Sequence, residues 1–117
     1  MKYISIVSIP VTDQQRAKEF YLKAGFTLIR EASFGPQTWI QLGFPDAQTS
    51  ITLVNWFPNM PAGSVRGLVI DVDDIEAKIG ELNSQGIAAG AVDKTPWGQF
   101  ATVTDPDGNA FSLHQPR

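Results

Sequence analysis

The sequence contains no cysteine and a single histidine, His114. Without cysteine the chain can form no disulfide, offers no thiolate to a metal ion and has no cysteine nucleophile. One imidazole cannot alone supply the converging ligands of a zinc-type or iron-type centre. The absence of cysteine also fits a reducing compartment, so the expected location is the cytoplasm.

Long apolar runs and concentrated positive charge are also missing. No apolar stretch approaches membrane-spanning length, and residues 1–3 lead directly into a strand-like pattern without the features of a signal peptide. The net charge is −3, and the nine lysines and arginines are scattered along the chain. We therefore expect neither a membrane nor a nucleic-acid partner. With 43% hydrophobic residues in 117, the chain is expected to form one packed domain.

The sequence contains an internal repeat that covers most of its length. Val11 and Val72 open equivalent segments, and Gly25 and Gly86 close them, both at an offset of 61 residues (72 − 11 and 86 − 25). Repeats of this kind predict two copies of one structural unit. The predicted modules cover residues 1–57 and 65–117, and a linker rich in proline and glycine covers residues 58–64.

The first module reads as a strand, a helix and three more strands. A capping box of Thr12 and Gln15 is expected to start the helix, and Gly25 is expected to end it. The helix carries an apolar stripe at positions 17, 20, 21 and 24. Strands are predicted over residues 3–11, 26–32, 37–43 and 49–56.

The second module repeats this order. Asp73 and Glu76 resemble a capping box, Ile75, Ile79 and Leu82 form the stripe, and Gly86 follows the helix. Strands are predicted over residues 66–72, 87–92, 99–104 and 109–115.

Each helix can cover only one face of its sheet, so two curled sheets facing each other would bury the bare faces and leave a cavity.

Three stretches carry a resemblance to a known superfamily. They are residues 9–13 with the Ala17-x-x-Phe20-Tyr21 helix, residues 67–74, and Asp-Pro-Asp-Gly-Asn at residues 105–109. Together they resemble the vicinal-oxygen-chelate superfamily of glyoxalases, bleomycin resistance proteins and dioxygenases. The resemblance implies an α+β fold of two βαβββ modules, the glyoxalase/bleomycin-resistance/dihydroxybiphenyl-dioxygenase fold. It also implies a homodimer in which sheets from both chains contribute to each site.

Enzymes of this superfamily mostly hold a divalent metal through His, Glu or Gln on the first and last strands of each module. Motif matching and the repeat offsets place these positions at Ile6, Thr52, Gly67 and Ser112. None of the four is a metal ligand of the usual kind. We therefore expect no metal cofactor, and metal-dependent glyoxalase or dioxygenase activity is disfavoured. The resemblance points instead to metal-free members that bind antibiotics or other small molecules.

Strand alternation separates residues that face the cavity from those under the helices. The helix-facing set is Val7, Ile9, Val11, Ile51, Leu53, Leu68, Ile70, Phe111 and Leu113. The pairs Trp39/Gln41 and Phe100/Thr102 each share a face, but the pattern does not say which face. The cavity-facing set is Ile4, Ile6, Ser8, Ser50, Thr52, Val54, Trp56, Gly67, Val69, Ala110, Ser112 and His114. The candidate ligand-binding residues are Ile6, Ser8, Trp39, Thr52, Val54, Trp56, Trp97, Ser112 and His114.

Several of these residues have two interpretations. Each tryptophan could line a pocket or belong to the core or a dimer interface. His114 could act as an acid, a base or an anchoring donor, or be an ordinary hydrogen-bonded histidine, with no carboxylate obviously beside it. The loop around Trp97 could close over a ligand or simply connect strands. Asp105 and Asp107 are expected in a tight turn rather than a calcium loop.

Three functions remain open at this point. The first is a small-molecule-binding protein whose ligand is small and partly apolar or aromatic. The second is a lyase, isomerase or dioxygenase that works without a conventional metal. The third is an interaction module with a filled cavity.

Overall fold

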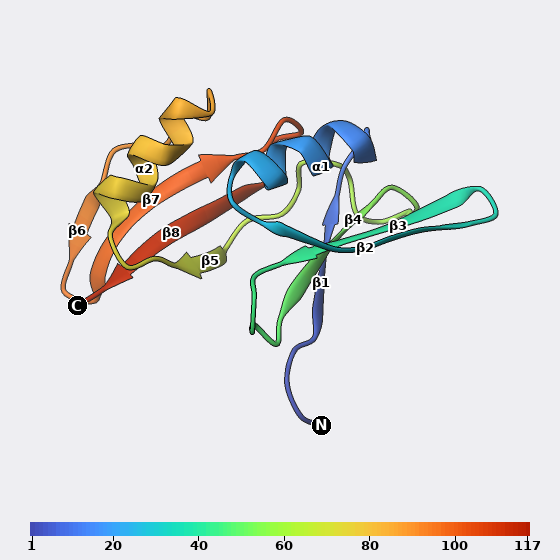
Figure 1. The fold of residues 1–117 in the computed structure, drawn as a ribbon, viewed down its shortest axis with the longest axis horizontal. Helices are drawn as coiled ribbons and strands as arrows, with labels where there is room; N and C mark the ends of the chain where they lie inside the picture. Colours follow the sequence, from blue (N-terminus) through green and yellow to red (C-terminus); the bar gives the residue numbers. More distant parts are fainter.

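The computed structural model describes all residues, 1–117, and contains the two predicted βαβββ modules (Figure 1). Each module has a four-stranded sheet, with strand orders β1-β4-β3-β2 and β5-β8-β7-β6. Neither helix is long and apolar enough to cross a membrane. The elements are β1 (Ile6–Pro10), α1 (Gln14–Lys23), β2 (Thr27–Phe34), β3 (Gln37–Gly43), β4 (Ser50–Val54), β5 (Leu68–Asp71), α2 (Ile75–Ser84), β6 (Asp93–Thr95), β7 (Gly98–Thr104) and β8 (Ala110–Pro116).

The first and last strands of each module pair in parallel, and the other pairs are antiparallel. One predicted strand is misplaced: residues 87–92 form no strand, and only Ala89 makes an isolated bridge, to Val103. The strand β6 follows at Asp93–Thr95 instead, where a short turn folds it back onto β7. Small residues occupy positions 88–91, and they give this stretch little side-chain surface to pack as a strand.

Both helices begin one residue later than the predicted capping boxes. Asp13 caps α1 by accepting hydrogen bonds from the backbone N–H groups of Gln15 and Arg16, each at 3.1 Å. The Thr12 hydroxyl donates to Asp107 Oδ1 at 2.6 Å, so it is not the cap. In the second module the cap is Asp74 and not the predicted Asp73, and its carboxylate accepts a hydrogen bond from the N–H of Ala77.

The Asp13 cap provides a simple test of the helix start. Replacing Asp13 with alanine leaves two N–H groups of the first turn without their side-chain acceptor, which costs about 1 kcal/mol. We expect that decrease in urea-induced unfolding followed by circular dichroism. The substitution Asp73→Ala is the matched control, because Asp73 does not cap α2, and it should change stability by less than about 0.5 kcal/mol. Equal losses in the two variants would contradict the assignment.

The predicted helix-facing set forms the core. Ile9, Val11, Ile51, Leu53, Phe111 and Leu113 belong to one buried cluster, and Val7, Leu68 and Ile70 pack against it. The cluster spans both modules, because it also includes Tyr21 of α1 and Ile75 of α2.

Hydrogen bonds also hold α1 on its sheet: the side-chain amide of Gln14 donates to the carbonyl oxygens of Thr38 and Leu53, at 2.7 and 2.8 Å.

The modules meet at the predicted Asp-Pro-Asp-Gly-Asn turn, whose first residue is buried. The Tyr21 hydroxyl donates to Asp105 Oδ2 at 2.8 Å, and the Asn109 side-chain amide donates to the Pro10 carbonyl at 2.8 Å. Burial, and then the carboxylate of Asp105, raise the pKa of the Tyr21 hydroxyl far above its usual range. The hydroxyl therefore stays protonated and acts as a hydrogen-bond donor. Both carboxylate oxygens of Asp105 accept hydrogen bonds from N–H and O–H groups of the protein, as expected for a tight turn.

The expectation that the two sheets of one chain face each other is wrong. Both helices lie along the same side of the molecule, and the two sheets lie side by side beneath them (Figure 1). No strand of one module pairs with a strand of the other. The faces opposite the helices are partly open, because the side chains of Ile6 and Val69 remain 38% and 51% exposed. We call these surfaces the module-one face and the module-two face.

Candidate functional site

The module-one face carries a chain of polar contacts. Trp39 Nε1 donates to Gln41 Oε1 at 3.1 Å, and Gln41 Nε2 donates to Ser50 Oγ at 2.8 Å. The hydroxyls of Ser8 and Thr52 lie 3.3 Å apart. Gln41 pairs with Thr52 across β3 and β4, which places Trp39 and Gln41 on this face and settles the question that the alternation left open.

The candidate residues of module one differ in accessibility. Ile6 is exposed, and Ser8, Trp39 and Trp56 are half-buried. Thr52 is only 1% exposed, so in a single chain a ligand could not reach most of it. Val54 is buried as well, and it lines a hollow of about 370 Å³ with Phe57 and the linker residue Met60. Val54 therefore lies apart from the open part of this face.

The module-two face gathers aromatic and titratable side chains. Strand pairing places Ser112 beside Val69 and Thr102, and His114 beside Asp71 and Phe100. The Phe100 ring stacks on the His114 imidazole, with centroids 4.5 Å apart and planes at 21°. Phe100 and Thr102 thus belong to the same face as Ser112 and His114.

His114 has the carboxylate neighbour that the sequence did not reveal. Asp71 Oδ1 lies 2.7 Å from His114 Nδ1, and the Trp97 carbonyl oxygen lies 3.2 Å from His114 Nε2. Both ring nitrogens therefore face acceptors. The hydrogen bond with Asp71, and to a smaller extent that with the Trp97 carbonyl, raises the pKa of the His114 imidazole above its ordinary value. Alternation along β5 contained the signal, because Asp71 is the next cavity-facing position after Val69.

Trp97 is the most accessible tryptophan of the candidate set, with 75% of its surface exposed. It sits in the turn between β6 and β7, residues 95–98, which we call the Trp97 turn. The Thr95 hydroxyl accepts from the Trp97 N–H at 3.2 Å and donates to the Gly98 carbonyl at 2.8 Å. These hydrogen bonds close the turn, whose backbone carbonyl at Trp97 contacts His114 on the module-two face and whose indole ring is largely exposed.

The four superfamily metal positions do not fit a metal ion. Ile6 and Gly67 have no donor atom in their side chains, and Thr52 and Ser112 offer only hydroxyls. Nowhere in the chain do three or more His, Asp or Glu side chains come together in a way that could hold a metal ion. No step of a reaction can therefore be assigned to a metal at these positions.

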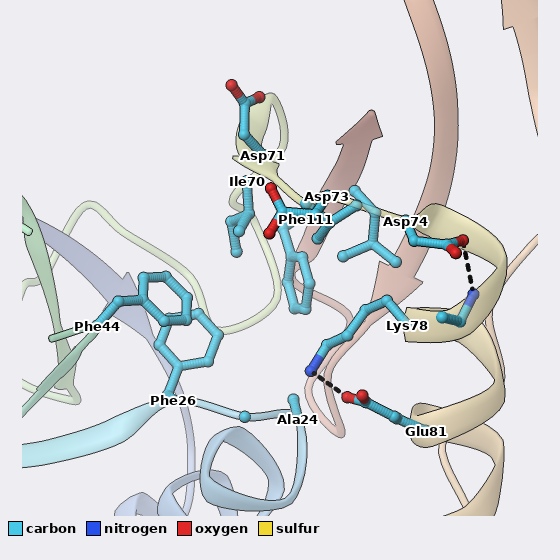
Figure 2. Close-up of a pocket in the computed structure, with 14 residues that line it drawn as sticks. Ala24, Phe26, Phe44, Ile70, Asp71, Asp73, Asp74, Lys78, Glu81 and Phe111 are labelled. Atoms are coloured by element: carbon cyan, nitrogen blue, oxygen red, sulfur yellow. Dashed lines mark hydrogen bonds and ion pairs between the residues drawn. The ribbon is translucent and has the colours of Figure 1, made fainter. Parts of the chain in front are cut away.

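A separate groove of about 430 Å³ lies between the modules, beside α2 (Figure 2). Figure 2 shows Phe26 and Phe44 on one side and Phe111 near the centre, while Lys78 and Glu81, both on α2, form an ion pair with their charged groups 3.5 Å apart. The carboxylate of Asp71 points away from the three phenyl rings. None of the nine candidate residues lines this groove.

The family model for the glyoxalase/bleomycin resistance protein/dioxygenase superfamily matches residues 3–113. An uncharacterized protein of Bacillus subtilis (strain 168), YetH, is 30% identical over 122 residues, covering 98% of this chain and 99% of its own.

Two solved structures from Streptomyces sp. CB03234 are similar throughout. TnmS3, an antibiotic binding protein, is 41% identical and has a TM-score of 0.95, with coverage of 100% of this chain and 98% of its own. A glyoxalase/bleomycin resistance protein is also 41% identical, with a TM-score of 0.88 and coverage of 97% and 100%. The repeat, the paired modules and these matches agree: the chain belongs to the glyoxalase/bleomycin resistance protein/dioxygenase superfamily.

Proposed function

We propose that the protein binds a small, partly apolar or aromatic molecule without a conventional metal site. The observation that carries this proposal is the composition of the two open faces. They present tryptophans, a stacked phenylalanine and histidine, and hydroxyls, where the superfamily's enzymes carry metal ligands. Apolar walls with a few fixed polar groups are typical of small-molecule sites. The similarity to TnmS3, an antibiotic binding protein, supports the same function.

The surroundings of His114 favour binding over acid–base catalysis. A general base needs a free lone pair within reach of the substrate. Here one ring nitrogen is held by Asp71 and the other by the Trp97 carbonyl, so neither points toward open space. The histidine is better suited to hold protein groups in place than to move a proton.

We further propose that the ligand lies between two copies of the chain. Within one chain the module-one and module-two faces lie side by side, and Ile4, Ile6 and Val69 leave apolar surface exposed. A second copy could cover these side chains and bring a module-one face opposite a module-two face. Burial of such surface is the usual driving force for association.

Both proposals can be tested on purified protein. Light scattering after gel filtration should give twice the mass of the 12.8 kDa chain. Bleomycin and a panel of planar aromatic antibiotics should be screened for a thermal shift and for quenching of tryptophan fluorescence. The substitution Trp97→Ala should weaken binding of a hit about tenfold, through loss of an exposed aromatic contact.

The matched control is Leu22→Ala, because Leu22 is an exposed apolar residue on α1, away from both faces. It should leave the affinity unchanged. Elemental analysis completes the test: stoichiometric Zn, Ni, Mn or Fe would favour the enzyme alternative. Absence of any shift or quenching across the panel would count against ligand binding.

A further inference from the structure

We propose that Asp71 and His114 are positioning residues that hold the Trp97 turn at the edge of the module-two face. Neither residue needs to touch a ligand in this role. The proposal depends on the proposed function only for the use of Trp97 in binding. The contact between His114 and the turn belongs to the free protein and can be tested there.

The geometry places the imidazole as a bridge between two elements. On one side it meets the carboxylate of Asp71 at the end of β5, and on the other it meets the carbonyl oxygen of Trp97. The Phe100 ring stacked on the imidazole restricts its rotation. A side chain held on three sides can fix the backbone that it contacts.

The bridge requires a proton on each ring nitrogen. Both partners are acceptors, and a neutral imidazole has only one N–H to donate. If the proton next to Asp71 is kept, the lone pair of Nε2 faces the Trp97 carbonyl oxygen at 3.2 Å, which is repulsive. The imidazolium satisfies both contacts. The Asp71 carboxylate therefore supports the turn indirectly, by stabilising the charged form of His114.

Thr95 and Gly98, the ends of the Trp97 turn, are held by backbone pairing with each other and, for Gly98, with Pro116 of β8, but few side chains contact the two residues between them. Most of the indole surface is exposed, so burial does little to fix the ring. Apart from the hydrogen bonds within the turn, Arg117 Nη1 donates to the Pro96 carbonyl at 3.2 Å. A Cβ at Gly98 would overlap the carbonyl oxygen of Gln115 and would lie 2.9 Å from His114 Nε2, so the turn lies close to both the β8 backbone and the imidazole. His114 is thus the side chain that contacts the backbone of Trp97 itself, at the tip of the turn.

The charged groups around His114 are few. Asp71 comes from β5, and Arg117, just beyond β8, contacts the same turn. On β6, Asp93 pairs with Phe100 and shares its face, but Phe100 lies between Asp93 and His114 in the strand register. The charged residues of α2 lie behind the sheet, on its helix-covered side. Asp71 is therefore the carboxylate whose removal should matter.

The test uses NMR on the ligand-free protein at constant ionic strength. His114 is the only histidine, so the spectrum contains one imidazole to titrate, and the three tryptophans give three indole N–H signals. The variant Trp97→Phe assigns the signal of Trp97. We expect the His114 midpoint to lie above the ordinary value of about 6.5. The Trp97 indole and backbone signals should shift with the same midpoint.

The variant Asp71→Asn should lower the His114 midpoint and shift the pH response of Trp97 with it. Asp73→Asn is the matched control: it removes an acid two residues away that makes no contact with His114, and it should leave both midpoints in place. His114→Gln keeps a donor toward the Trp97 carbonyl but cannot titrate, so the Trp97 signals should become independent of pH.

Two results would overturn the proposal. One is a His114 midpoint that is the same in wild type and Asp71→Asn. The other is a Trp97 signal that does not follow the titration of His114. If Asp71→Asn does not fold, the His114→Gln comparison decides alone. Because no ligand is present, failure here leaves the proposal of ligand binding standing, and failure of the ligand screen leaves this one standing.

Discussion

Replacing Asp105 with alanine is expected to lower the free energy of unfolding by about 4 kcal/mol. The buried carboxylate accepts four hydrogen bonds. Oδ1 accepts from the backbone N–H groups of Asp107 and Asn109, both at 2.9 Å. Oδ2 accepts from the Tyr21 hydroxyl at 2.8 Å and from the Asn109 side-chain amide at 2.9 Å. Removing the carboxylate leaves the Tyr21 hydroxyl and two backbone N–H groups without this acceptor, while the Asn109 side-chain amide keeps only its bond to the Pro10 carbonyl. Each buried group that loses its partner costs free energy.

Urea unfolding at fixed protein concentration measures the effect of Asp105→Ala. Tyr21→Phe removes only one of the four donors and should cost about 1 kcal/mol. The double variant should cost less than the sum, because the two side chains share one hydrogen bond. Asp93→Ala removes an exposed carboxylate from β6 and should be nearly neutral. A loss for Asp105→Ala no larger than for Asp93→Ala would show that the network does not stabilise the module junction.

The second large effect is expected at Gly63, in the linker. Its backbone has φ +83°, which side chains rarely adopt, and a Cβ there would overlap the carbonyl oxygen of Asp107. Gly63→Ala must therefore both strain the linker and push the Asp-Pro-Asp-Gly-Asn turn away from module one. We expect a loss of about 3 kcal/mol in the free energy of unfolding.

Gly67 supplies the matched control for this substitution. Its φ is +87°, nearly that of Gly63, but a Cβ there would have no atom within 4 Å. Gly67→Ala should therefore cost only about 1 kcal/mol, the penalty of the backbone conformation itself. The difference between the two variants isolates the close approach of linker and turn. Equal losses would mean that this approach does not stabilise the protein.

Much of the fold could be predicted from the sequence because the repeat and the strand alternation are local signals. The offset between Gly25 and Gly86 placed both helices, and alternation placed the core residues on the correct face. The helix caps were predicted one residue early, because adjacent residues such as Thr12 and Asp13 can both cap. The choice depends on Asp107, 95 residues away, which accepts the hydrogen bond of the Thr12 hydroxyl.

The arrangement of the two sheets could not be predicted in the same way. A repeat shows that two modules are alike but not how they pack, and that packing depends on single contacts such as Tyr21 with Asp105. The contact between His114 and Asp71 could be predicted from one further piece of information, the pairing of β5 with β8. Once β5 and β8 are paired in parallel, Asp71 stands beside His114, but the register had to be known first.

The Gln14 amide gives α1 a role beyond covering its sheet. Apolar burial has no direction, and on its own it would tolerate small sliding of a helix over a sheet. By donating to carbonyls of β3 and β4, Gln14 fixes the helix along its axis. Tyr21 lies seven residues further along α1, which is two helical turns or about 10 Å. Because Gln14 fixes α1 relative to β3 and β4, the strands of module one determine the position of Tyr21, and therefore the position at which Asp105 of module two is bound.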